Sequence, residues 1–123
     1  MSDLKHFGSF FRLDATAFLL AGAKKVIITA RKAGGEQGID QAVDKLNKLP
    51  GIKGCAVGIA ANVAQTEDIE RLVNEVKRTN QEVDILVANA GATWGGPFEP
   101  TPDWSSQKVL DLNVRGVFNL VRL

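Results

Sequence analysis

Polar side chains follow three short apolar runs of the sequence. Arg31 comes after residues 26–30, Asn62 after 54–60, and Asn89 after 83–88. If these runs are parallel strands, ligands bind beyond their carboxyl ends, so the three side chains are expected at one edge of a sheet. A base after the first strand favours a cofactor with a 2′-phosphate, NADP, although an ordinary solvated strand end has the same pattern. The two asparagines, and Gly91 after Asn89, are either turn residues or ligand contacts.

A further candidate lies in the last patterned segment, which is expected to be a helix that begins at Asp103 or Trp104. On a helical wheel Asn113 lies within about 60° of the centre of an apolar stripe, and Asn119 lies on the opposite, solvated side. The stripe consists of Leu110, Val114, Val117 and Val121. A buried amide needs a hydrogen-bond partner. Asn113 therefore either holds a backbone carbonyl or a water for structural reasons, or orients groups in a site.

These residues are positioned by alternating strands and helices. Between the first two runs, apolar residues of 39–46 recur at helical spacing until Pro50 and Gly51 end the pattern. Before the third run, Thr66 is a favourable N-cap for a second helix. The apolar stripe of that helix consists of Ile69, Leu72, Val73 and Val76. This order predicts an α/β fold with a parallel sheet of about three strands, in one domain over residues 1–123.

The composition restricts the class of protein. A chain of 123 residues with 45% hydrophobic and 24% charged residues is typical of one globular domain. Because 15 basic residues balance 14 acidic ones, neither nucleic acid nor an anionic membrane is an expected partner. The apolar stretch 15–23 is too short to span a bilayer, and Cys55 has no neighbours for a metal site. We therefore expect a cytoplasmic protein without a bound metal. The chain contains no tyrosine, which excludes a phenolic acid or base.

Two other features are interpreted as structural. The stretch Gly34–Gly38 follows a strand and opens a helix, but it is not G-x-G-x-x-G, and Glu36 would repel a pyrophosphate. We interpret it as a flexible loop. His6 has no carboxylate, cysteine or second histidine nearby and is expected at the surface.

Four segments together resemble the short-chain dehydrogenase/reductase family in their order and spacing. They are VIITAR at 26–31, ANV at 61–63, DILVANAG at 84–91 and LDLNV at 110–114. The resemblance covers nearly everything from Ala17 to Leu123. The segment ATWGGPF at 92–98, with PDW at 102–104, is most similar to the subgroup related to 3-oxoacyl-carrier-protein reductases. The resemblance implies a Rossmann-like, doubly wound sheet and hydride transfer between a nicotinamide cofactor and a carbonyl or alcohol substrate.

The resemblance also implies a role for each matching residue. Arg31 would meet the adenosine phosphate of NADP, and Asn62 and Val63 would flank the adenine. The residues that line the cofactor cleft would be Asn89, Ala90 and Gly91. Asn113 would be the asparagine of the catalytic tetrad, because an amide in the middle of a helix can hold a water in a proton relay.

Several features depart from the family's pattern. The family's opening strand and T-G-x-x-x-G-x-G turn should precede residues 17–23, but the only glycine of 4–16 is Gly8. Ala88 stands where the family has an asparagine, and Asn62 where it has an aspartate. The 123 residues include no catalytic serine segment and no Tyr-x-x-x-Lys, so no general acid is available to protonate a carbonyl oxygen. Without the first strand, neighbouring strand edges would be unpaired, unless residues 4–11 substitute as a strand.

Three hypotheses remain. The first is an incomplete copy of an NADP-dependent carbonyl reductase that binds its cofactor weakly or not at all and is inactive alone. The second is a non-catalytic remnant that binds part of a nucleotide, or that associates with a complete relative or with its own copies through the last helix. The third, another nucleotide- or flavin-binding α/β domain, requires a phosphate loop that the sequence does not show.

Overall fold

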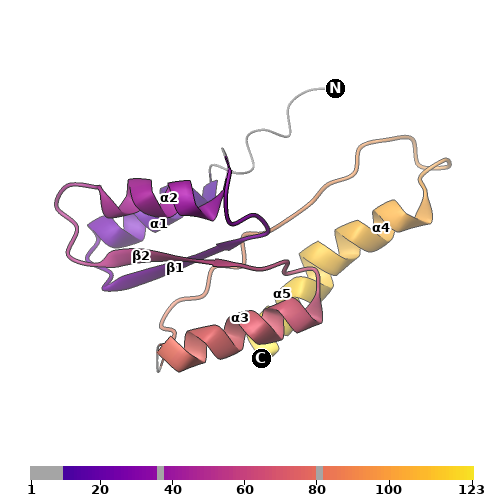
Figure 1. Cartoon of the computed structure of the whole chain (residues 1–123). Helices are drawn as coiled ribbons and strands as arrows, with labels where there is room; N and C mark the ends of the chain where they lie inside the picture. The colour runs from indigo at the N-terminus through magenta and orange to yellow at the C-terminus, as the bar shows by residue number, and fades with distance from the viewer. Residues whose placement is uncertain (1–9, 36–37, 80–81) are drawn as a thin grey trace. The chain divides into compact units, whose positions relative to one another are not determined.

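The computed structural model describes residues 10–35, 38–79 and 82–123. The chain divides into two compact units, Met1–Ala60 and Ala61–Leu123, whose α-helices and β-strands are labelled in Figure 1.

The first unit is a two-stranded parallel sheet with two helices. Helix α1 spans Phe10–Leu20, strand β1 Lys25–Ala30, helix α2 Ile39–Asn47 and strand β2 Cys55–Ala60. The strands pair in parallel, from Lys25 opposite Cys55 to Ala30 opposite Ala60. Both helices lie on the same face of this sheet (Figure 1). The first two predicted strands, the helix between them and the parallel pairing are therefore confirmed.

Apolar side chains from all four elements meet between the helices and the sheet. This core consists of Ala15, Leu19, Ile28, Ile39, Ala42, Leu46 and Ala56. Gly58 lets α2 approach β2 closely, because a Cβ at this position would run into the side chain of Ile39. Burying one leucine or isoleucine contributes about 1.5–3 kcal/mol relative to leaving it exposed. The core is therefore expected to be a main source of the stability of this unit.

The suggestion that residues 4–11 form a strand is wrong where the structure describes them. Phe10 and Phe11 belong to α1. Residues 4–9, and with them the predictions for His6 and Gly8, lie outside the described residues.

The second unit is built from helices. Helix α3 spans Thr66–Thr79, and residues 82–102 follow without a helix or strand. Then come helix α4, Asp103–Leu110, a π-helical turn η2, Asp111–Arg115, and helix α5, Gly116–Arg122. Helices α3 and α5 pack together, and Ile69 and Leu72 of α3 are buried. The predicted helices at Thr66 and Asp103 are confirmed, but Thr66 is the first residue of α3 and not its N-cap, because the carbonyl of Gln65 accepts the N–H of Ile69 (3.1 Å).

The predicted strand over residues 83–88 is wrong. Its apolar side chains are 50% to 64% exposed; they are Val83, Ile85, Leu86 and Val87. Their composition favours a strand, but a strand forms only where a neighbouring backbone supplies the hydrogen bonds. No other strand occurs in the described part of this unit.

The last helical segment packs through a different face from the one its apolar pattern predicts. Leu110, Val114 and Val121 are 57% to 67% exposed, whereas Ser105, Gly116 and Asn119 are buried. The turn η2 contributes to this error, since the N–H of Gly116 bonds the carbonyl of Asp111, five residues back. A π-turn inserts a residue into the helix and rotates the subsequent helical turns by roughly 100° relative to a regular wheel. Among the described helices, none is long and apolar enough to cross a membrane.

Candidate functional site

Arg31 lies where the sequence places it, directly after the end of β1, and its side chain is exposed. The first two backbone N–H groups of α2 are bonded within the chain, since Ile39 donates to the carbonyl of Lys32 (3.1 Å) and Asp40 to that of Ala33 (3.0 Å). A phosphate loop at Gly34–Gly38 would need such groups free. Residues 36–37 of that stretch lie outside the described residues. Of the predicted site residues, Arg31 is the one that lies in the described part of the first unit.

The turn over residues 61–65 carries Asn62 and Val63, both half-buried, and is fixed by short hydrogen bonds. The N–H of Asn62 donates to Oδ2 of Asp68 (2.7 Å), and Oδ1 of Asn62 accepts the N–H of Ala64 (3.2 Å). The N–H of Gln65 donates to the carbonyl of Asn62 (2.9 Å). An asparagine that bonds the backbone two residues ahead is a common turn device. Asn62 thus has a structural role that uses its backbone and its side-chain oxygen.

The charge of Asp68 supports this turn. The backbone N–H of Asn62 and then the guanidinium of Arg71 bond its carboxylate, and both lower the pKa of Asp68. Hydrogen bonds to the ionised form are the main cause of the shift. At neutral pH Asp68 is therefore a stable acceptor that holds the turn against the start of α3.

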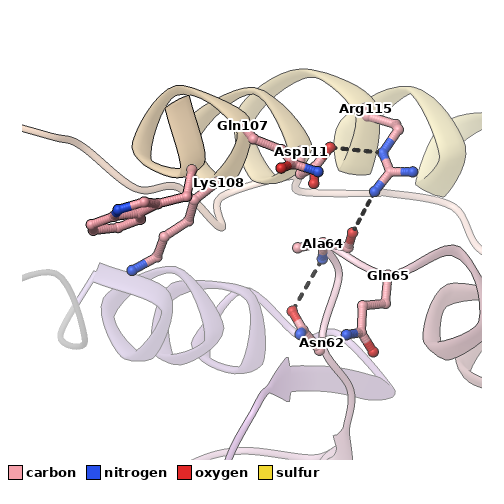
Figure 2. A pocket seen from close by; sticks show the side chains of 8 residues that line it. Asn62, Ala64, Gln65, Gln107, Lys108, Asp111 and Arg115 are labelled. Atoms are coloured by element: carbon pink, nitrogen blue, oxygen red, sulfur yellow. Dashed lines mark hydrogen bonds and ion pairs between the residues drawn. The ribbon is translucent and has the colours of Figure 1, made fainter. Parts of the chain in front are cut away.

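The last helical segment also forms a hydrogen bond with this turn. Nη2 of Arg115 donates to the carbonyl of Ala64 (3.2 Å), and Nε of Arg115 lies 3.0 Å from Oδ1 of Asp111 (Figure 2). Gly116, the next residue, lets the helix backbone approach the turn, because a Cβ there would run into the carbonyl oxygen of Val63. The turn is thus bonded by α3 and by η2.

A pocket of about 330 Å³ lies beside the turn, between it and the helical segment α4–η2 (Figure 2). Its lining consists of Asn62, Ala64, Gln65, Trp104, Gln107, Lys108, Asp111 and Arg115. The ring of Trp104 packs edge-on against Trp94, with centroids 4.8 Å apart and planes at 80°. Such edge-to-face pairs are a preferred aromatic arrangement. The pocket combines an aromatic wall with amide and cationic groups.

Arg115 and Asp111 are two site residues that the sequence reasoning missed. Opposite charges four residues apart are a readable signal for an ion pair on a helix. The bond from Arg115 to Ala64 joins residues 51 positions apart, and no local pattern announces it.

The side chain of Asn113 bonds the backbone of Ala92, next to the predicted cleft residues 89–91. Its Nδ2 donates to the carbonyl of Ala92 (2.7 Å), and its Oδ1 accepts the N–H of Ala92 (2.8 Å). A Cβ at Gly91 would lie 3.2 Å from that same oxygen, so the backbone passes close to the amide. The expectation that Asn113 is buried is wrong, since its side chain is exposed. The alternative that it holds a backbone carbonyl is what the structure shows.

The predicted cleft residues Asn89, Ala90 and Gly91 are exposed and lie in an irregular segment. The N–H of Asn89 donates to the carbonyl of Val87 (3.1 Å). The two hydrogen bonds between Asn113 and Ala92 fix the end of this segment to η2. The sequence predicts Asn113 and Asn89–Gly91 as separate candidates, and the structure places the Asn113 side chain beside the backbone of Gly91.

The prediction that Asn119 is solvated is wrong. Its side chain is only 8% exposed, and Nδ2 donates to Oγ1 of Thr66 (3.1 Å), while Oδ1 accepts from Nη2 of Arg122 (3.2 Å). These partners satisfy the buried amide and allow a polar residue to face α3. Asn119 thus ties the start of α3 to α5.

The hydrogen-bonding capacity of the site suits a nucleotide. Within the described part of the chain no protein partner is assigned to Nδ2 of Asn62, which leaves a donor beside the pocket. An amide donor can bond a ring nitrogen of adenine, and Val63 offers an apolar contact to a base. Asn113 uses one amide hydrogen and one oxygen lone pair on Ala92, so it retains one of each for a water or a ligand.

Comparison with known proteins identifies the family. Residues 13–123 match the short chain dehydrogenase family model, and the chain belongs to this family. It is 32% identical over 111 residues to the rhamnolipids biosynthesis 3-oxoacyl-[acyl-carrier-protein] reductase of Pseudomonas aeruginosa. That alignment covers 90% of this chain and 40% of the relative.

Other relatives give the same result. The 3-oxoacyl-[acyl-carrier-protein] reductase FabG of Staphylococcus epidermidis is 30% identical over 95 residues, which cover 77% of this chain and 38% of that protein. Among solved structures, the Pseudomonas aeruginosa RhlG/NADP active-site complex has a TM-score of 0.74 at 30% identity, over 88% of this chain and 39% of that one. The chain thus has a Rossmann-type fold and spans about two fifths of the length of these relatives.

Proposed function

We propose that this chain carries the adenosine-side contacts for NADP in a short-chain reductase that acts on a carbonyl or 3-oxoacyl substrate. The observation that carries the proposal is that η2 holds two predicted cofactor segments at once. Arg115 bonds Ala64 next to Asn62 and Val63, and Asn113 bonds Ala92 next to Asn89–Gly91. π-Turns are rare and are frequent at functional sites.

Each residue has a distinct task in this proposal. The exposed guanidinium of Arg31 provides charge-assisted hydrogen bonds for a 2′-phosphate. Asn62 presents an amide donor where the family's aspartate would accept, so it favours a ring nitrogen of the base over an exocyclic amine. The similarity to the Pseudomonas aeruginosa RhlG/NADP active-site complex supports the choice of cofactor.

The bound nicotinamide would supply or accept the hydride. Asn113 would keep Gly91 and Ala92 beside η2 and retain hydrogen-bonding capacity for a water. Because the sequence contains no tyrosine, the group that protonates the carbonyl oxygen in the family has no counterpart in these 123 residues. The proposal is therefore binding without turnover by this chain alone.

A titration with reduced cofactors tests the proposal. NADPH is expected to bind about tenfold more tightly than NADH, which corresponds to one charge-assisted hydrogen bond of about 1.4 kcal/mol. Arg31→Met should remove this preference, and Arg12→Met, an exposed base elsewhere in the same unit, should retain it. Absorbance of NADPH should stay constant with a β-ketoester. Equal affinities for both cofactors, or sustained NADPH oxidation, would contradict the proposal, and binding of a flavin instead would favour a different nucleotide domain.

A non-catalytic role in association is favoured by a separate observation. Leu110, Val114, Phe118 and Val121 recur along α4–α5 and are 57% to 67% exposed. Contiguous exposed apolar side chains mark interaction surfaces. Light scattering after size exclusion tests this role, and Val114→Ser with Phe118→Ser should convert an assembly to monomers. A monomeric wild-type chain would oppose association between its own copies.

A further inference from the structure

The last helical segment contacts the turn 61–65 and the first residue of α3. Arg115 bonds the carbonyl of Ala64, Gly116 lies against the carbonyl of Val63, and Asn119 bonds Thr66. Two consecutive residues, Arg115 and Gly116, thus contact two consecutive residues of the turn. A displacement of the helix surface at Arg115 would therefore be transmitted to the backbone that carries Asn62 and Val63.

Arg115 is suited to hold this turn because of its planar group. Nε pairs with Oδ1 of Asp111 at 3.0 Å, which orients the guanidinium and leaves Nη2 directed at Ala64 (Figure 2). A lysine has a single ammonium on a flexible stem and cannot reproduce this fixed fork. Since the Arg115 side chain is half exposed, the ion pair alone contributes little to stability. The main effect of Arg115 is therefore on the conformation of the turn 61–65.

From this geometry we infer that Arg115, oriented by Asp111, is a positioning residue for nucleotide binding. It fixes the turn 61–65 so that Nδ2 of Asn62 and the side chain of Val63 are placed for the base, and it does so through the carbonyl of Ala64. The inference rests on the proposed function, because it assigns the base to this turn. Asp68 bonds the same turn from α3, so removal of Arg115 loosens the turn without unfolding it.

The test compares Arg115→Met and Arg115→Lys with Arg78→Met in the 123-residue chain. Arg78 is a matched control because it forms an exposed ion pair with Glu75 on α3. The probe is adenosine 2′,5′-bisphosphate, followed by calorimetry, and amide hydrogen exchange reports the turn. Arg115→Met should weaken binding about tenfold and speed exchange at residues 62–65 about tenfold. Arg115→Lys should lie between Arg115→Met and the wild type, and Arg78→Met should change binding less than about twofold.

Each outcome decides the inference. Unchanged affinity and unchanged exchange in Arg115→Met would overturn it, as would an equal loss in Arg78→Met. If the wild-type chain binds no adenosine bisphosphate, the proposed function fails, and the exchange measurement alone then decides whether Arg115 positions the turn. If Arg115→Met does not fold, Arg115→Lys carries the comparison. Faster exchange confined to 62–65 supports the role, and exchange equal to that of the wild type overturns it.

Discussion

The two units of the chain hold their backbones in different ways. In Met1–Ala60, helices and strands enclose a continuous apolar core. In Ala61–Leu123, Ile69 and Leu72 are buried, but many large apolar side chains are exposed, and polar side chains connect distant segments. The proposed nucleotide contacts of the second unit therefore depend on a few hydrogen bonds, whereas the stability of the first unit depends on the packing of its apolar core.

In both units an asparagine side chain bonds the N–H and the carbonyl of one distant residue. Asn47 bonds both backbone groups of Ala56, with its Oδ1 2.7 Å from the N–H nitrogen and its Nδ2 3.1 Å from the carbonyl. Asn113 does the same to Ala92. Ala56, however, belongs to a strand that is paired with β1, and Ala92 belongs to an irregular segment. The same pair of bonds therefore adds to an existing sheet in one unit and fixes an otherwise irregular segment in the other.

The largest effect is expected from the core of the first unit. Leu19→Ala removes a side chain that is fully buried, and it should destabilise the unit by about 2–5 kcal/mol. Leu20→Ala, the neighbouring position, removes a side chain that is 57% exposed and should change stability by less than about 0.5 kcal/mol. Urea unfolding followed by circular dichroism measures both. Equal losses for the two variants would show that α1 does not pack as described.

An intermediate effect is expected from the two asparagines. Asn47→Ala should lower the stability of the first unit by about 1 kcal/mol, because it leaves groups of a paired strand unbonded. Asn113→Ala should leave the unfolding midpoint nearly unchanged and increase the hydrogen-exchange rate of the Ala92 amide about tenfold. A global loss of stability in Asn113→Ala, with no local change at Ala92, would contradict the contrast between the units.

The smallest effect is expected from acid. The pKa of Asp68 is lowered in the folded chain, mainly by the N–H of Asn62 and then by Arg71. A lowered pKa contributes stability that is fully present above the unfolded value of about 3.9 and is lost as pH falls through the lower, folded value. Exchange of the Asn62 amide, corrected for intrinsic pH dependence, should therefore accelerate only in that acid range.

Two variants complete the acid experiment. Asp68→Asn should remove the acid dependence of the Asn62 amide. Glu75→Gln is the control, because Glu75 also has a lowered pKa, caused chiefly by its hydrogen bond with Arg78, but it does not contact the turn. If Glu75→Gln changes the Asn62 amide as much as Asp68→Asn does, then the turn does not depend on Asp68.

The sequence is most informative where local pattern and packing agree. Residues 26–30 and 55–60 lie in paired strands, and the helix between them buries its predicted apolar face at Ile39, Ala42 and Leu46. The segment 83–88 has an equally strong strand composition, but it is exposed and irregular. Whether such a segment forms a strand depends on a neighbouring strand, and local composition does not predict that neighbour. The family resemblance of the sequence is confirmed, and it depends on motif order rather than on any one element.

The site was predicted only in part, for a related reason. A regular wheel places Asn113 near the buried stripe, yet the helix contains a π-turn and buries Gly116 and Asn119 instead. The partner of Asn113 is a backbone group 21 residues away, and the partner of Arg115 is 51 residues away. Such long-range bonds to backbone atoms carry no sequence signature, because any residue supplies the same carbonyl.

The most direct test of the proposed nucleotide contacts is an amide chemical-shift titration of the 123-residue chain with adenosine 2′,5′-bisphosphate. Saturable shifts are expected at Asn62, Val63 and residues 89–92, which η2 holds through Arg115 and Asn113. Residues 69–76, along the body of α3, should not shift. Saturable binding that leaves Asn62, Val63 and residues 89–92 unshifted would contradict the assignment of the nucleotide contacts to these segments.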